Sequence, residues 1–410
     1  MELLQPVIRP YAWGSAHGIA ELQGRPVPAA GPEAELWMGA HPSAPSGVAR
    51  NGHRTTLDAV IAADPQRELG AGCVARFGTR LPFMLKVLSA ARALSIQVHP
   101  SRAQAQAGFC AENERGLAAG DPARNYTDDW PKPELLCAFT PFEALAGLRP
   151  PADAAGILRA LGVGQLRPLA AELEAAAGPQ VLPSVLAGIL DWPLAGRERL
   201  VGDVAAACAG LAAGNGPYAD ACAAAAREAA HHPGDLGVVA MLLMRHAVLR
   251  PGQALFMPAG GLHAYLRGTA VEVLANSDNV VRAGLTGKHV DTSELLALLD
   301  PAVTVPVLAP RGLAAGVATY DTPAPEFRLH VASLAGETAA LPGAGPRILL
   351  CTAGVAVLGS ESGAAAKVGR GESCFVSAAD GTLWCTGPAR AFIAGAGSAD
   401  ATAGAGSTAG

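Results

Sequence analysis

Residues 252–263 read GQALFMPAGGLH, and this stretch predicts a β fold with a histidine placed after a tight corner. Gly252 is a turn signal, and the apolar run 254–257 predicts a short strand. The Pro-x-Gly at residues 258–260 predicts a second turn. His263 follows shortly after that turn.

Residues 94–100 read LSIQVHP and supply two further side chains with metal-binding atoms. The apolar residues around them predict a strand. Positions two apart in a strand point to the same face, so Gln97 and His99 can reach one ion together.

Residues 131–134 read PKPE. Alternate prolines exclude a helix and favour extended backbone, so Lys132 and Glu134 point the same way. A carboxylate beside an ammonium can serve as metal ligand and proton handler. The alternative is a surface salt bridge on a proline-rich loop.

The composition indicates a globular protein with sizeable cores. The chain has 410 residues, 50% hydrophobic and 16% charged, which favours two or three domains. Its net charge of −5 argues against a nucleic-acid partner but allows a local basic pocket for an anionic small molecule. No stretch approaches the roughly 18 apolar residues of a membrane span. We therefore expect no nucleic-acid or membrane partner, and a monomer.

The eight cysteines are scattered and form no C-x-x-C pair, so we expect no cysteine zinc site. The first residues, MELLQ, lack the basic and apolar regions of a signal peptide. Both observations favour reduced thiols and a cytoplasmic location.

Apolar patterning divides the chain into five segments. Strands and loops are expected in 1–100, and a helix within 101–120. Good helix formers at helical spacing predict an all-α module in the middle. The segments are 1–150 (first part of a metal-binding domain), 151–248 (helical insert), 249–310 (second part), 311–395 (short β segments, a C-terminal domain without metal) and 396–410 (disordered tail).

The corner at 252–263 resembles the second motif of cupin barrels, and Gln97-x-His99 takes the place of their usual His-x-His pair. The resemblance implies a mostly β fold with a helical insert. It contains two cupin-type barrels (jelly rolls), the second without metal, plus the all-α module.

Several motifs in the same order are similar to those of type I mannose-6-phosphate isomerases, zinc-dependent phosphomannose isomerases of the cupin superfamily. The similarity runs from about residue 7 to about 300, and more weakly to about 395. The motifs are 11–15 (YAWGS), 35–42 (ELWMGAHP), 95–100 (SIQVHP), 132–134 (KPE), 263–265 (HAY) and 276–286 (NSDNVVRAGLT).

This resemblance implies an enzyme that interconverts mannose 6-phosphate and fructose 6-phosphate with one Zn²⁺ per chain. The family's ligands fall on Gln97, His99, Glu134 and His263, and its active-site arginine on Arg282. Two imidazoles, a carboxylate and an amide oxygen suit Zn²⁺ first, while Mn²⁺, Co²⁺ or Fe²⁺ also match these ligand types.

The chain departs from the family at two positions that bear on chemistry. Pro131 stands where the family often has histidine, so a histidine base there cannot operate. Gly287 replaces the proline of the common Thr-Pro-Lys, which loosens the loop that carries Lys288.

Aldose–ketose isomerisation moves a proton between C2 and C1 through an enediolate, so it needs a Lewis acid and a base. The candidate bases are Glu272, Lys132 and Asp278, which the sequence does not rank. Arg282 can stabilise the enediolate or hold the phosphate. Further substrate contacts are expected from the following residues: Ser95, Lys86, Lys288 and, in the sugar pocket, Tyr265.

Each assignment has a plainer alternative. Lys86 lies in an apolar strand and could be an edge residue with its ammonium in water. Arg282 could form a structural ion pair, and Glu272 could be a wall carboxylate. Five other histidines are expected to be structural or exposed: His41, His53, His231, His232 and His246. Rival functions are a cupin dioxygenase or another isomerase with the same metal cage, and a sugar-phosphate-binding cupin without turnover.

Overall fold

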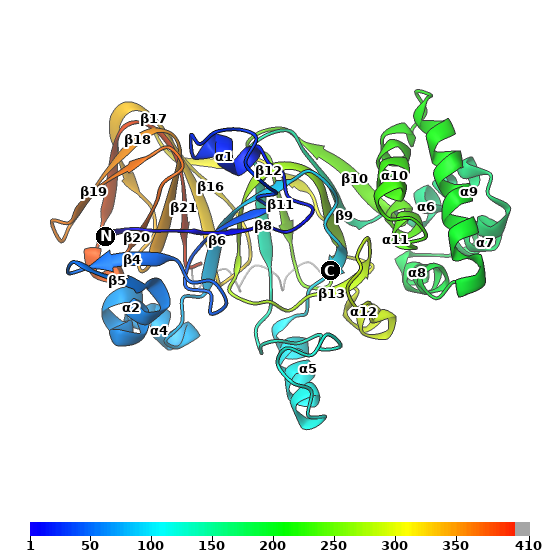
Figure 1. The fold of residues 1–410 in the computed structure, drawn as a ribbon, viewed down its shortest axis with the longest axis horizontal. Helices are drawn as coiled ribbons and strands as arrows, with labels where there is room; N and C mark the ends of the chain where they lie inside the picture. The colour runs from blue at the N-terminus through cyan, green and yellow to red at the C-terminus, as the bar shows by residue number, and fades with distance from the viewer. Residues whose placement is uncertain (398–410) are drawn as a thin grey trace, which may run out of the picture.

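The computed structural model describes residues 1–397, and most of the expected tail 396–410 therefore lies outside the described residues. The fold is mostly β-sheet with helices. Figure 1 shows the sheet that contains β17–β21 on the left, the sheet that contains β6, β8 and β12 in the middle, and a group of helices on the right.

The middle sheet has eleven strands in the described part of the chain, and the partners of β12 (His263–Ala275) explain how it gathers distant segments. Its first residue, His263, pairs with Gln97 of β7 and with Ala146 of β9. Its second half pairs with β6 and β8. The other strands of this sheet are β2 (Val7–Arg9), β3 (Glu35–Met38), β6 (Phe83–Ala90), β7 (Ile96–Val98), β8 (Glu134–Ala138), β9 (Phe142–Leu148), β10 (Met244–Leu249), β11 (Ala254–Met257), β13 (Val281–Gly284) and β14 (Val307–Leu308).

Within residues 1–397, the C-terminal sheet has eight strands, three of them much longer than the short segments expected for 311–395. The expectation of short strands was wrong because some glycines that look like turn signals in the sequence lie inside strands. Gly336, at φ 141°, sits where the β17–β21 register shifts, as in a β-bulge. The strands are β1 (Glu2–Leu3), β15 (Arg311–Ala314), β16 (Val317–Tyr320), β17 (Arg328–Leu341), β18 (Arg347–Ser360), β19 (Ala365–Gly369), β20 (Ser373–Val376) and β21 (Leu383–Gly395).

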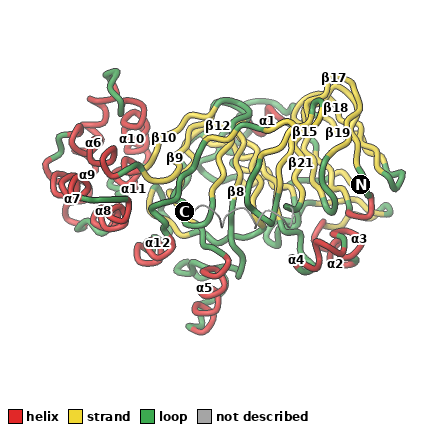
Figure 2. Tube along the Cα trace, turned by 180° about the vertical axis from the view of Figure 1, so that it is seen from behind, coloured by secondary structure: helices red, strands yellow, loops and turns green. Residues whose placement is uncertain are grey.

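The helical insert expected for 151–248 is helical from 151 to 243, whereas residues 244–248 belong to strand β10 of the middle sheet. Its helices lie together at one end of the molecule (Figures 1 and 2). We call this region the helical module. Its leucines and valines form one buried cluster with residues of β7, β9, β12 and β13, so it is packed directly onto the middle sheet. The helices are α6 (Pro151–Leu161), η1 (Gly164–Leu166), α7 (Arg167–Ala175), η2 (Pro179–Val181), α8 (Leu182–Leu190), α9 (Leu194–Ala212), α10 (Ala219–His231), α11 (Gly237–Ala240) and η3 (Met241–Leu243).

Residues 1–100 contain helices that the expectation of strands and loops missed. They are α1 (Gly18–Leu22), α2 (Leu57–Ala63), α3 (Pro65–Leu69) and α4 (Ala71–Phe77), beside the hairpin β4 (Gly47–Arg50) and β5 (His53–Thr56). Each helix has at most seven residues, too few to show a periodic apolar pattern.

The helix expected within 101–120 is confirmed as α5 (Arg102–Glu114), which begins with a capping box on Ser101 and Gln104. A further helix, α12 (Thr292–Leu298), follows β13. Among residues 1–397, no helix combines the length and apolarity needed to cross a bilayer.

Candidate active site

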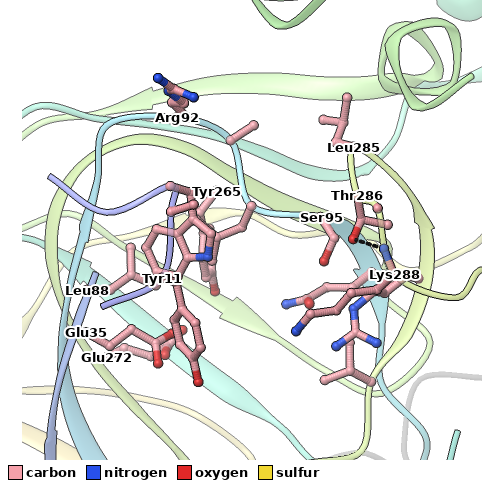
Figure 3. A pocket seen from close by; sticks show the side chains of 18 of the residues that line it. Tyr11, Glu35, Leu88, Arg92, Ser95, Tyr265, Glu272, Leu285, Thr286 and Lys288 are labelled. Carbon is pink, nitrogen blue, oxygen red and sulfur yellow. Dashed lines mark hydrogen bonds between the residues drawn. The ribbon is translucent and has the colours of Figure 1, made fainter. Parts of the chain in front are cut away.

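A cavity of about 600 Å³ is lined by strands of the middle sheet and by two histidines of the helical module. Every site residue expected from the sequence lines it except His99 and His263, which lie buried behind Gln97 and Glu134. Figure 3 shows Glu35 and Glu272 on one side of the cavity and Ser95, Thr286 and Lys288 on the other.

His99, Glu134 and His263 form a buried cluster whose ligand atoms lie within 4.8 Å of one another. Nε2 of His99 is 3.3 Å from Oε1 of Glu134, and Nε2 of His263 is 3.4 Å from Oε2. Each Nδ1 lies within hydrogen-bond distance of a backbone carbonyl, 2.7 Å from Asn279 and 3.0 Å from Gly261. These contacts orient both imidazoles with Nε2 towards the carboxylate, an arrangement typical of metal-ligating histidines.

The electrostatics of this cluster favour a bound cation. Burial lowers the pKa of His99 to about 4, so its imidazole is neutral. Burial opposes ionisation of Glu134, but the positive charge of Lys132 and a hydrogen bond with His263 hold its pKa well below the usual value. The buried Nε2 of His99 has no hydrogen-bond partner in the described structure. A buried imidazole nitrogen without a hydrogen-bond partner, next to a carboxylate, offers the kind of ligand atoms that a divalent ion binds.

Gln97 reaches the same cluster, because its side-chain amide lies 3.2 Å from Nε2 of His263. Rotating the amide by 180° exchanges its oxygen and nitrogen, so the oxygen can take that position. Tyr265 also contacts the cluster, since its hydroxyl donates a hydrogen bond of 3.3 Å to Glu134.

A second set of charged side chains, one each from β3, β6 and β12, faces the cavity. Nζ of Lys86 lies 3.7 Å from Glu272 and 3.8 Å from Glu35, and all three side chains are buried. Burial and the charge on Glu134 raise the pKa of Glu272. Burial opposes the charge of Lys86, but the carboxylates of Glu35 and Glu272 raise its pKa above the usual value.

Two other candidate bases occupy different surroundings. Nζ of Lys132 lies 3.6 Å from Oε1 of Glu134 and is buried with it. Asp278 pairs with His41 at 3.2 Å, and its side chain is 44% exposed. Despite its partial burial, the hydrogen bond from His41 lowers the pKa of Asp278 to about 2.

The other side of the cavity carries cations without acidic partners. Within residues 1–397, no carboxylate lies within 4.0 Å of the charged atoms of Arg282 or Lys288. The same holds for Arg92, which lines the cavity away from Lys288 (Figure 3). Burial lowers the pKa of Arg282. Burial and the charge of Arg282 lower the pKa of Lys288. Unpaired cations next to Ser95 and Thr286 make this side suited to an anionic group.

Sequence reasoning assigned no catalytic or binding role to several residues that line the cavity, although it expected Trp13 and Trp37 to pack near the site. Glu35 and Trp37 lie in a motif used for the resemblance, where Trp37 donates a 2.6 Å hydrogen bond to Glu35. His231 and His232 had been expected to be structural or exposed. No local pattern marks them, since only tertiary packing brings the end of α10 to the cavity. The remaining residues in this group are Tyr11, Trp13 and Arg92.

Comparison with known proteins gives consistent matches. The family model described as phosphomannose isomerase type I, catalytic domain, matches residues 1–151. The chain is 34% identical to the mannose-6-phosphate isomerase of Salmonella typhimurium over 393 residues, which covers 95% of this chain and 98% of that one. The Escherichia coli enzyme is also 34% identical, over 400 residues with the same coverage.

Solved structures match over nearly the whole chain. A crystal structure of a mannose 6-phosphate isomerase bound with zinc and yttrium has a TM-score of 0.87 at 32% identity, covering 97% of this chain and 100% of that one. A mutant phosphomannose isomerase from Salmonella typhimurium has a TM-score of 0.89 at 32% identity, covering 97% and 99%.

Proposed function

This chain belongs to the family of type I mannose-6-phosphate isomerases, and from that premise we propose that it is a zinc-dependent isomerase of mannose 6-phosphate and fructose 6-phosphate. One observation carries the proposal. A buried His-Glu-His cluster, which reaches the cavity through Glu134, and a set of cations that have no carboxylate partner among residues 1–397 belong to the same cavity, which is large enough for a hexose phosphate.

The residues present fit a zinc ion. We assign His99, Glu134 and His263 as ligands, with Gln97 as the fourth, because the orphaned Nε2 of His99 and the neighbouring carboxylate leave a site that a cation completes. When bound, such an ion supplies Lewis-acid stabilisation of negative charge on a sugar oxygen.

We assign the proton transfer between C2 and C1 to Glu272. Its carboxyl group is buried at the cavity wall, and its raised pKa suits a base that works near neutral pH. Asp278 is a weaker base because its pKa is lowered, and Lys132 is held by Glu134. Lys86 stays positively charged beside Glu272, so it can stabilise the negative charge that develops on the enediolate.

We assign the phosphate to the opposite side, with Arg282, Lys288 and Ser95 as its contacts. Both cations line the cavity without a carboxylate partner among residues 1–397, so a phosphate can approach them without displacing an ion pair. Arg282 lies on β13, beside Gln97 in the register, and can also stabilise the enediolate. Lys86 is engaged by two carboxylates, which favours a role beside the base over a phosphate contact.

The finer architecture is part of the proposal. We propose that the middle sheet and the C-terminal sheet each close as a cupin-type barrel, with the expected boundaries at residues 150, 310 and 395, and with the boundary expected at 248 moved to 243, just before β10 begins. The division of β12 between β7 and β9 at one end and β6 and β8 at the other supports a rolled sheet. We also propose that the protein is monomeric and cytoplasmic.

A coupled assay with mannose 6-phosphate, before and after treatment with a chelator, tests the function. We expect turnover that stops on chelation and returns with Zn²⁺. Metal-loaded protein that turns over no hexose 6-phosphate, yet binds one, would instead support a non-catalytic sugar-phosphate sensor. Oxygen consumption with bound iron would support the dioxygenase alternative.

A further inference from the structure

The turn that joins α10 to α11 in the helical module lies against the loop that carries Lys288. His231 and His232, at the start of this turn, line the cavity. Asp235, three residues further on, accepts a hydrogen bond from the backbone N–H of Thr286 at 3.0 Å. The helical module is therefore connected to the cation side of the cavity by a specific contact.

The contact continues to Lys288 through Thr286. Oγ1 of Thr286 accepts a hydrogen bond from the backbone N–H of Lys288 at 3.1 Å. Gly287 stands between the two, and a Cβ built on it would meet no atom within 4 Å, so packing does not hold the loop there. The conformation of residues 286–288 therefore depends on hydrogen bonds at Thr286.

Close backbone packing fixes Asp235 relative to this loop. A Cβ added to Gly237 would lie 2.5 Å from the backbone nitrogen of Leu285, and one added to Gly284 would lie 2.6 Å from Cα of Gly237. The other oxygen of Asp235 accepts a 2.7 Å hydrogen bond from the N–H of Gly237. The carboxylate is thus fixed on its own turn and presented to Thr286.

From these contacts we propose that the α10–α11 turn is part of the substrate site, and that Asp235 is a positioning residue for the anion-binding Lys288. Asp235 does not line the cavity, and it acts through Thr286. This inference rests on the proposed function for the identity of the substrate. It predicts that a residue of the helical module controls affinity for the phosphate group.

The test compares Asp235→Asn with Asp203→Asn, the same chemical change at an exposed position of α9. Loss of one charge-assisted hydrogen bond should raise KM for mannose 6-phosphate roughly tenfold. The Kd for inorganic phosphate, measured by titration calorimetry, should rise to the same extent. We expect kcat to change less than about threefold, zinc content to stay constant, and Asp203→Asn to behave as wild type.

A merely structural role would give a different result. If Asp235→Asn lowered Tm but left KM and the phosphate Kd unchanged, the inference would be wrong. Thr286→Val gives a second variant with the backbone N–H intact. It should weaken phosphate binding, and Thr286→Ser should restore it; equal binding by the valine and serine variants would contradict the second hydrogen bond.

A double-mutant cycle asks whether Asp235 acts through Lys288. In a Lys288→Met background, Asp235→Asn should change the phosphate Kd less than about twofold, because the group it positions is gone. Additive effects would overturn the inference. Wild-type protein without isomerase activity would overturn the proposed function instead, and the phosphate Kd would still test the role of Asp235.

Discussion

Glu272 on β12 and Lys86 on β6 are directly paired across neighbouring antiparallel strands, with Oε2 and Nζ 3.7 Å apart. Both are buried, and both face the cavity. The positive charge of Lys86 lowers the pKa of Glu272, against a larger upward effect of burial and of Glu134. The pKa of Glu272 therefore lies between that of an ordinary carboxyl group and that of a fully desolvated one.

This pairing predicts the direction in which the pH profile moves. Glu272 acts as a base only when ionised, so kcat/KM should fall as the pH drops through its raised pKa. Lys86→Met removes the charge that lowers this pKa, so the acidic limb should move to higher pH. Lys86→Arg keeps the charge and should leave the limb near the wild-type position. If the acidic limb of Lys86→Met moved to lower pH, this would contradict the assignment of Glu272 as the base.

Glu272→Gln should reduce kcat by about 10²- to 10⁴-fold, because a positioned base contributes that much. Zinc content should stay at the wild-type level, since Glu272 is outside the cluster of His99, Glu134 and His263. Near-normal kcat in this variant, measured by the coupled assay, would transfer the base role to another residue.

His263→Ala should lose metal and activity together, since three ligands remain around the ion. We expect metal affinity to fall by about 10²-fold or more, because even residues that only orient ligands contribute 10- to 100-fold. Metal analysis after dialysis and the coupled assay measure the two effects. His53→Ala, at an exposed histidine of β5, is the control. A His263→Ala protein with full zinc and full rate would refute the ligand assignment.

Arg282→Met should keep the metal and lose about 10²- to 10³-fold in kcat/KM, the effect expected when one stabilising donor is removed. A loss in kcat would indicate that Arg282 stabilises the enediolate, and a rise in KM that it holds the phosphate. Arg267→Met, at an exposed arginine of β12, should remain active. Normal kinetics for Arg282→Met would remove Arg282 from the active site.

His330 in the C-terminal sheet should make the folded state sensitive to acid. Burial lowers its pKa to about 4, and its buried Nδ1 has no hydrogen-bond partner in the described structure. An unfolded histidine has a pKa of about 6.5, so between these values the unfolded state binds the additional proton. The free energy of unfolding should therefore decrease as the pH falls from about 6.5 to 4, by at most about 3 kcal/mol at about 1.36 kcal/mol per pH unit.

His330→Leu should reduce this pH dependence, because no proton can bind at that position in either state. Urea unfolding of zinc-loaded wild type and variant at pH 7.5 and 5.0 measures the difference. His53→Leu changes an exposed histidine and should keep the wild-type slope. An unchanged slope in His330→Leu would show that other groups account for the acid sensitivity.

Several features of the site follow from local sequence. The pair Gln97 and His99, the Pro-x-Gly corner before His263 and the proline-flanked Glu134 each fix a short piece of extended backbone. The structure brings the two histidines and the glutamate together within 4.8 Å. The helical character expected for 151–248 was also visible in the sequence and holds as far as residue 243, because helix propensity and period are local properties.

Other features depended on contacts between segments far apart in the chain. The short helices α1–α4 and the length of β17 and β18 escaped prediction, since short elements lack a period and a glycine bulge resembles a turn. The partnership of Glu35 with Lys86 arises from pairing between β3 and β6, which no motif spacing specifies.

By itself, the sequence determined the type of each chemically active group and the strand or turn that holds it, because backbone preference and side-chain chemistry act over a few residues. Only the tertiary structure decided which carboxylate faces a lysine, which cations are left unpaired, and that Asp235 of a distant helical module reaches Thr286. Those relationships arise when β-sheet register and hydrophobic burial bring remote segments together, and burial then sets the charge of each group.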